Sequence, residues 1–185
     1  MKKAVVFLIT VCLLLLSAGC GSPEKPAEIP KEMEDRLQRY ETLAQVEYGD
    51  LKATLSAYRD ENRCELVFRE PEALRGLRAV MNRGKATVSF GSVSLNLTER
   101  GMTDDFVGRL LIGILNRKSG ETGVTARLEG DGFHLLSKME GDGRCDLRID
   151  AKTGFLVTLD YPEKNLHVEF YEFRFIEPQE PASAA

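Results

Sequence analysis

The chain of 185 residues is long enough for one domain with a hydrophobic core of its own, and 43% of its residues are hydrophobic. Its formal net charge is −4, and it has neither tryptophan nor a basic run of the kind that follows a phosphate backbone. This composition argues against nucleic acid as a partner, because the aromatic and basic motifs of the common nucleic-acid-binding modules are missing.

The chain begins with Lys2 and Lys3 and continues with an apolar run from Ala4 to Leu16. This run is shorter than the roughly 20 residues that a helix needs to cross a bilayer. Residues 1–19 are therefore predicted to be a secretory signal peptide.

Small residues precede Cys20 in the sequence Leu16-Ser17-Ala18-Gly19-Cys20, which resembles the bacterial lipobox. The resemblance implies cleavage before Cys20 and attachment of acyl chains such as palmitate to its thiol. The protein would then be a lipoprotein outside the cytoplasm, anchored to the cell membrane or, in a host with two membranes, to the outer membrane. An ordinary signal peptide followed by an incidental cysteine is the alternative.

Three prolines lie between Cys20 and Lys31, so residues 20–30 are predicted to form a flexible tether after the lipidated cysteine. Residues 177–185 have a similar composition and are predicted to be a disordered tail. The folded domain is expected to span residues 31–176.

The first half of that domain is predicted to be a short helix followed by strands. Met33 and Leu37 recur at helical spacing, which predicts an amphipathic helix from Pro30 to about Arg39. Apolar residues then alternate with polar ones, as in half-buried strands. The predicted strands cover Ala44–Tyr48, Leu51–Ala57, Cys64–Phe68, Gly76–Val80, Ala86–Phe90 and Val93–Leu97.

A second helix is predicted in the middle of the chain, where Thr103 can cap an apolar segment that runs to Leu115. Packing over the sheet as part of the core is the favoured interpretation. The alternative is that the helix lines or covers an apolar cavity for acyl chains. The candidate cavity-lining residues are then Phe106, Leu110, Leu111 and Ile114.

Two acidic turns, at 129–132 and 140–143, bracket a predicted strand in the second half. Calcium is disfavoured there because neither turn has the ligand spacing of a calcium loop. The last strand, from Leu166 to about Ile176, carries aromatic residues on both faces, which predicts a central position or a bulge. Between the second acidic turn and the last strand, two further strands are predicted, Cys145–Ile149 and Phe155–Leu159.

Cys64 and Cys145 remain once Cys12 and Cys20 are set aside. Outside the cytoplasm they could form a disulfide, and two buried free thiols are the equally weighted alternative. A metal site is not expected, because two thiols without nearby histidines do not complete a zinc ligand set.

Catalysis is not expected, because none of the common catalytic or cofactor-binding motifs occurs in the sequence. His134 and His167 lie within predicted strands, where outward-facing or hydrogen-bonded histidines are the common case. Asp104-Asp105 suit the first turn of a helix, and Asp146 and Asp150 suit a solvated sheet face. No cofactor is expected.

About ten or eleven antiparallel strands with two helices predict a mainly β (α+β) domain whose sheet curls into a half-barrel. Three features resemble the lipoprotein-carrier fold of LolA and LolB and germination lipoproteins of the GerS type. They are the strand Cys64–Phe68 followed by Pro71–Arg75, the mid-chain helix, and the hairpin from Leu147 to Leu156. The resemblance implies helices inside the curve of an eleven-stranded sheet, and no catalysis.

The expected function is that of a membrane-anchored, non-catalytic binding protein that holds a lipid or an acylated ligand in the concave face of the sheet. The alternative is a protein-interaction scaffold for an enzyme of the cell envelope or the spore cortex. A cell-envelope hydrolase is a remote third interpretation.

Overall fold

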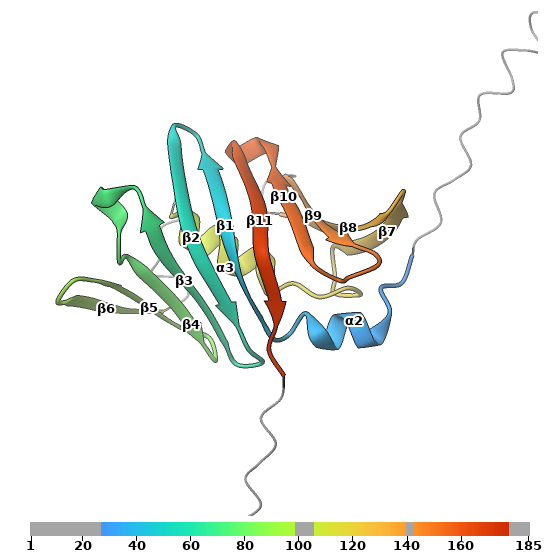
Figure 1. The fold of residues 1–185 in the computed structure, drawn as a ribbon, viewed down its shortest axis with the longest axis horizontal. Coiled ribbons are helices and arrows are strands. Elements are labelled where there is room, and N and C mark those ends of the chain that lie inside the picture. Colours follow the sequence, from blue (N-terminus) through green and yellow to red (C-terminus); the bar gives the residue numbers. More distant parts are fainter. Residues whose placement is uncertain (1–26, 99–105, 140–142, 178–185) are drawn as a thin grey trace, which may run out of the picture.

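The computed structural model describes residues 27–98, 106–139 and 143–177, with the side chains of 97 and 98 left out. Eleven strands form one antiparallel sheet in the order β6-β5-β4-β3-β2-β1-β11-β10-β9-β8-β7, which confirms the predicted fold class. The sheet is curved and open, and α3 lies inside the curve (Figure 1). No described helix is both long and apolar enough to span a bilayer.

The elements have the following bounds: α2 Lys31–Arg36, β1 Tyr40–Tyr48, β2 Leu51–Arg59, β3 Arg63–Glu70, β4 Arg78–Asn82, β5 Lys85–Phe90, β6 Val93–Thr98, α3 Val107–Leu115, β7 Val124–Glu129, β8 Gly132–Lys138, β9 Arg144–Asp150, β10 Leu156–Tyr161 and β11 Leu166–Phe175. Short 3-10 turns occupy Glu72–Leu74 and Pro162–Lys164.

The core lies between the concave face of the sheet and α3. Alternate residues of the strands point inward, as Leu55 of β2 and Leu147 of β9 do, and they are almost fully buried. The helix contributes Leu111, Ile112 and Ile114, each 1% exposed. The helix therefore packs over the sheet as core, which is the interpretation favoured by its sequence.

The last strand, β11, lies in the middle of the sheet, paired with β1 on one side and β10 on the other. Its register with β1 shifts between Glu41 and Leu43, and Glu172 of β11 has a φ of 51°. The shift is a β-bulge, since β11 has one more residue than β1 there. Both features predicted from the aromatic residues on its two faces, the central position and the bulge, are present.

The beginning of the domain differs from the prediction in two respects. The helix α2 ends at Arg36, and Tyr40 begins a strand because it pairs with Arg59 of β2 and Phe175 of β11. The folded part also includes residues 27–30, which the composition assigns to the tether. Ile29 is 6% exposed, and the Ala27 amide donates a hydrogen bond to the Ala126 carbonyl at 3.0 Å.

The strand β7 is absent from the predicted set, although Val124 and Ala126 alternate with polar residues. Several predictions fall outside the described residues: the signal peptide, the lipidation of Cys20, the cap at Thr103 and the pair Asp104-Asp105. The same holds for residues 140–142 of the second acidic turn and 178–185 of the tail.

Cys64 and Cys145 are both free and buried, so the disulfide is not formed and the alternative of two free thiols holds. They lie on β3 and β9, with four strands between them. At about 4.8 Å per strand the two lie about 24 Å apart along the sheet, beyond the reach of a disulfide.

Candidate functional site

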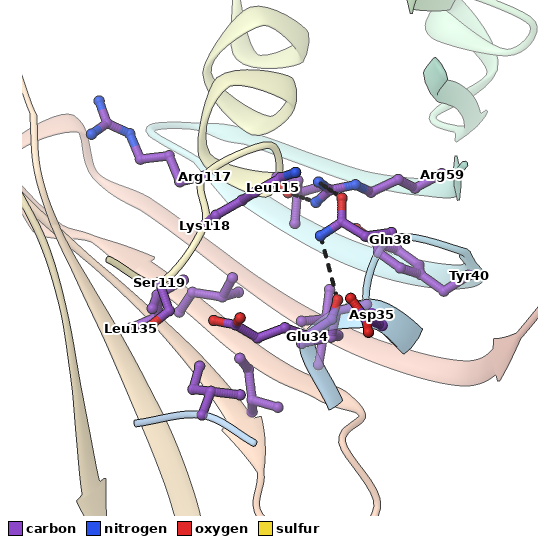
Figure 2. Close-up of a pocket in the computed structure, with 15 residues that line it drawn as sticks. Glu34, Asp35, Gln38, Tyr40, Arg59, Leu115, Arg117, Lys118, Ser119 and Leu135 are labelled. Atoms are coloured by element: carbon purple, nitrogen blue, oxygen red, sulfur yellow. Dashed lines mark hydrogen bonds between the residues drawn. The ribbon is translucent and has the colours of Figure 1, made fainter. Parts of the chain in front are cut away.

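A cavity of about 210 Å³ lies on the concave side of the sheet, between α2, the segment that follows α3, and strands β8 to β10 (Figure 2). Its apolar wall comes from the inward-facing residues of these strands, each at most 5% exposed: Leu135, Leu147, Ile149 and Leu156. Ile29, Leu37 and Leu115 extend this wall, while Glu34, Asp35, Arg117, Lys118 and Ser119 contribute polar groups near its mouth.

The opposite side of the cavity is polar and buried, because Tyr40 and Arg59 reach it from β1 and β2. Arg59 is 7% exposed, and its guanidinium donates hydrogen bonds to the Leu115 carbonyl and, at 3.1 Å, to Oε1 of Gln38. Gln38 in turn donates from Nε2 to the Glu34 carbonyl at 3.4 Å (Figure 2). This chain of contacts joins the end of α3 to α2 across the cavity.

The Tyr40 hydroxyl is buried and has no hydrogen-bond partner among the residues that the structure describes. Burial raises the pKa of Tyr40, so the group stays a neutral phenol that can donate one hydrogen bond. The Tyr40 ring itself stacks on Phe173. The cavity therefore has an unused donor in its wall.

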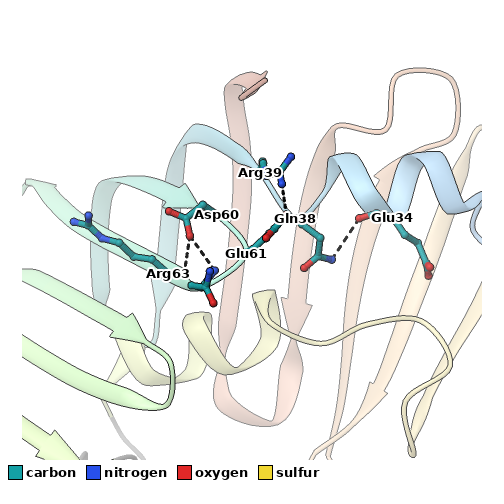
Figure 3. A network of polar contacts seen from close by, with 7 residues as sticks. Glu34, Gln38, Arg39, Asp60, Glu61 and Arg63 are labelled. Carbon is teal, nitrogen blue, oxygen red and sulfur yellow. Dashed lines mark hydrogen bonds and ion pairs between the residues drawn. The ribbon is translucent and has the colours of Figure 1, made fainter. Parts of the chain in front are cut away.

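Polar contacts at the end of α2 fix this short helix beside the cavity (Figure 3). Arg39 forms an ion pair with Glu61 in the turn between β2 and β3. Oδ1 of Asp60 accepts the backbone N–H of Arg63 at 2.9 Å and so shapes that turn. On the helix, the Arg36 guanidinium lies 3.9 Å from the centre of the Phe175 ring. A helix of this length is unstable alone, so the Arg36 and Arg39 contacts, together with the packing of Met33 and Leu37 against the core, hold it in place.

The four residues predicted to line a cavity do not line this one. Leu111 and Ile114 are buried in the core, and Phe106 and Leu110 are half-buried and pack against the core. Leu115, one residue further along the chain, is the part of α3 that reaches the cavity.

Sequence reasoning missed the polar side of the cavity. Arg59 continues the inward-facing series of Ala53, Leu55 and Ala57 on β2. Its place in this series indicates, from the sequence alone, a polar group on the concave side of the sheet. A charged residue in the inward series of a strand is rare unless the site gives it a partner or a role.

Both histidines are hydrogen-bonded to carboxylates on neighbouring strands. His134 Nδ1 lies 2.9 Å from Oδ2 of Asp146, and His167 Nδ1 lies 2.6 Å from Oδ1 of Asp160. These contacts confirm that they are satisfied strand residues. Within the described ranges, no group of three or more His, Cys, Asp or Glu side chains could hold a metal ion.

No protein-family model and no curated protein sequence matches this chain. Among solved structures, an uncharacterized conserved protein from Thermus thermophilus is similar to it with a TM-score of 0.53 and 12% identity, covering 85% of this chain and 97% of that chain. The two chains share a fold, and identity this low shows no more than that.

Two other solved structures are similar at lower scores. A LolA superfamily protein from Nitrosomonas europaea has a TM-score of 0.41 and 9% identity, over 82% of this chain and 96% of that chain. A chain from the complex of the CwlD amidase with the GerS lipoprotein of Clostridioides difficile has a TM-score of 0.46 and 15% identity, over 83% of this chain and 100% of that chain.

Proposed function

We propose that this protein is a non-catalytic binding protein that holds the apolar part of an amphiphilic ligand in the concave face of its sheet. The observation that carries the proposal is the cavity, which has a wall of aliphatic side chains and a polar mouth. Interiors of domains are close-packed, so a hollow that opens to solvent and combines an aliphatic wall with polar groups is a candidate ligand site. Its volume suits a short acyl chain or one end of a longer one.

We also propose that a lipid on Cys20 holds the domain at the outer surface of a membrane. The support comes from the sequence Leu16-Ser17-Ala18-Gly19-Cys20 after an apolar segment. Replacement of Cys20 by serine should release the protein from the membrane fraction without a change in its thermal stability. A serine variant that stays in the membrane fraction contradicts this part of the proposal.

Filling the cavity tests the binding function. The chain has no tryptophan, so a single introduced tryptophan also reports its own environment. Leu147→Trp should place the indole in the cavity, give blue-shifted emission and abolish binding of octanoate or octanol. Leu128→Trp is the matched control, because Leu128 is 52% exposed and outside the cavity.

The wild-type chain and the Leu128→Trp control should bind at least one of these two ligands, measured by calorimetry. Lipid should also copurify with the wild-type protein in native mass spectrometry. If wild type binds neither ligand and carries no lipid, the binding function is wrong.

A scaffold for another envelope protein is the second candidate, and the exposed side chains near the sheet edge favour it. Val93 and Leu95 of the edge strand β6 are 62% and 56% exposed, and Phe90 of β5 is 48% exposed. An edge strand with apolar side chains can pair with a strand of another protein. Val93→Lys should abolish copurification of such a partner, whereas Ser94→Lys, on the other face of β6, should not.

A further inference from the structure

The buried side of the cavity holds a hydroxyl without a hydrogen-bond partner and a guanidinium without an ion pair among the described residues. The hydroxyl of Tyr40, a residue only 1% exposed, has no partner among the described residues. Buried polar groups without a partner destabilise a fold and are rare, so each one calls for an explanation. A ligand atom that accepts a hydrogen bond in the cavity would provide one.

Arg59 supplies the second donor and a positive charge. Its contacts within the described part of the chain are to neutral oxygens, of Leu115 and Gln38, and it forms no ion pair there. A guanidinium has five N–H donors, and these two contacts account for two of them. A buried charge without an opposite charge is unfavourable, and an anion beside Arg59 would remove that cost.

The two donors lie side by side. Tyr40 and Arg59 are directly opposite each other in the pairing of β1 with β2, so their side chains leave the same face of the sheet. Figure 2 shows both on one side of the cavity, with Leu135 on the other. The carboxylates of Glu34 and Asp35 also line the cavity, but they belong to the partly exposed helix α2 and neither is paired with Arg59.

We infer that the ligand carries a carboxylate, which accepts hydrogen bonds from the Tyr40 hydroxyl and the Arg59 guanidinium while its hydrocarbon chain lies against Leu135, Leu147 and Leu156. The ligand is then a fatty acid, rather than a neutral alcohol or ester of the same chain length. This inference rests on the proposed binding function and adds the chemical class of the ligand.

The test compares ligands that differ only in the head group. The full-length chain is titrated with octanoate, octanol and methyl octanoate by calorimetry at about pH 8, where the acid is ionised. Octanoate should bind about tenfold or more tightly than the other two, as expected for charge-assisted hydrogen bonds.

Tyr40→Phe removes the hydroxyl and keeps the ring. It should weaken octanoate binding about tenfold and octanol binding by less, because a carboxylate accepts a stronger hydrogen bond than a neutral hydroxyl does. Without ligand its thermal stability should equal or exceed that of the wild type, because an unpartnered buried hydroxyl is lost. Tyr58→Phe is the control, since the Tyr58 hydroxyl contacts Asp60 at 3.2 Å and lies outside the cavity; it should leave all three affinities unchanged.

Equal affinities for octanoate and octanol, with no effect of Tyr40→Phe on either, would overturn the inference that the ligand is recognised through a carboxylate. The proposed binding function would be unaffected by that result. A Tyr40→Phe variant that loses stability without losing octanoate affinity would also overturn it, because the hydroxyl would then be satisfied within the protein. If wild type binds none of the three ligands and carries no lipid, the binding function itself has failed.

Discussion

The ring of Tyr40 on β1 stacks on the ring of Phe173 on β11, with ring centres 4.9 Å apart and planes inclined by 25°. The bulge in β11 makes this contact possible, because strict alternation from Leu166 and Val168 would turn Phe173 to the outer face. One residue with positive φ, Glu172, therefore brings an aromatic side chain against a wall of the cavity.

Substitutions at Glu172 should change stability according to the cost of a positive φ. Glycine adopts this conformation freely, so Glu172→Gly should raise the free energy of unfolding by up to about 1 kcal/mol. The β-branched Glu172→Val should lower it by about 1 kcal/mol or more. Urea denaturation of the two variants measures both effects, and a valine variant more stable than the glycine variant would contradict the assigned backbone conformation.

Two glycines of α3 provide a matched pair for the packing of this helix. A Cβ on Gly108 would lie 2.6 Å from the Phe106 ring and 3.4 Å from the Cβ of Ala79, whereas a Cβ on Gly113 would meet nothing within 4 Å. Gly108→Val should therefore destabilise the domain by about 1–3 kcal/mol through overpacking. Gly113→Val should change its stability by less than about 0.5 kcal/mol.

Thermal denaturation of both glycine variants is the measurement. Equal destabilisation by the two substitutions would mean that α3 does not approach β4 through Gly108.

The free thiols should be unreactive in the native protein. Burial raises the pKa of the Cys64 thiol to about 11 and that of Cys145 to about 12, so the reactive thiolate is scarce at neutral pH. Iodoacetamide should modify neither residue in the native chain and both after denaturation, as read by peptide mass spectrometry. A disulfide-linked peptide containing both cysteines would contradict their positions on β3 and β9.

His167 should make stability depend on pH. Its hydrogen bond to Asp160 raises the pKa of His167 above its ordinary value of 6.5, with a further contribution from Glu169. Because the folded state binds the proton more tightly, the stabilisation is complete below about pH 6.5 and is lost as the pH rises through the raised pKa.

His167→Gln should accordingly lower the melting temperature at about pH 5.5 and have little effect at about pH 9, where the wild-type histidine is neutral. Asp160→Asn should remove the same pH dependence, since it removes the partner. An effect of His167→Gln that is larger at the higher pH would contradict this assignment.

The alternation of apolar and polar residues along the chain predicts most of the strands. A half-buried strand has an apolar residue at every second position, where the side chain faces the core. The prediction fails at the end of α2, where Met33, Leu37 and Tyr40 keep helical spacing but Tyr40 gains two strand partners. Pairing with distant strands outweighs a local preference, and no local pattern contains that information.

The cavity was not predictable in the same way. Leu147 and Leu159 both occupy inward positions of adjacent strands, yet Leu147 lines the cavity and Leu159 is fully buried in the core. The difference depends on what lies opposite each side chain, which is set by where α2 and the segment after α3 cross the sheet. Arg59 was the available signal, because a charge in an inward series is costly without a role.

The pairing of β1 with β11 at the centre of the sheet also determines when this domain can fold. The first and last described strands are neighbours, so during synthesis β1 has only β2 beside it until β11 emerges. The contact that joins the two halves of the sheet spans nearly the whole domain and forms at a high entropic cost. A chain interrupted before Leu166 would leave both halves with an unpaired strand edge, which makes them substrates for proteases and chaperones.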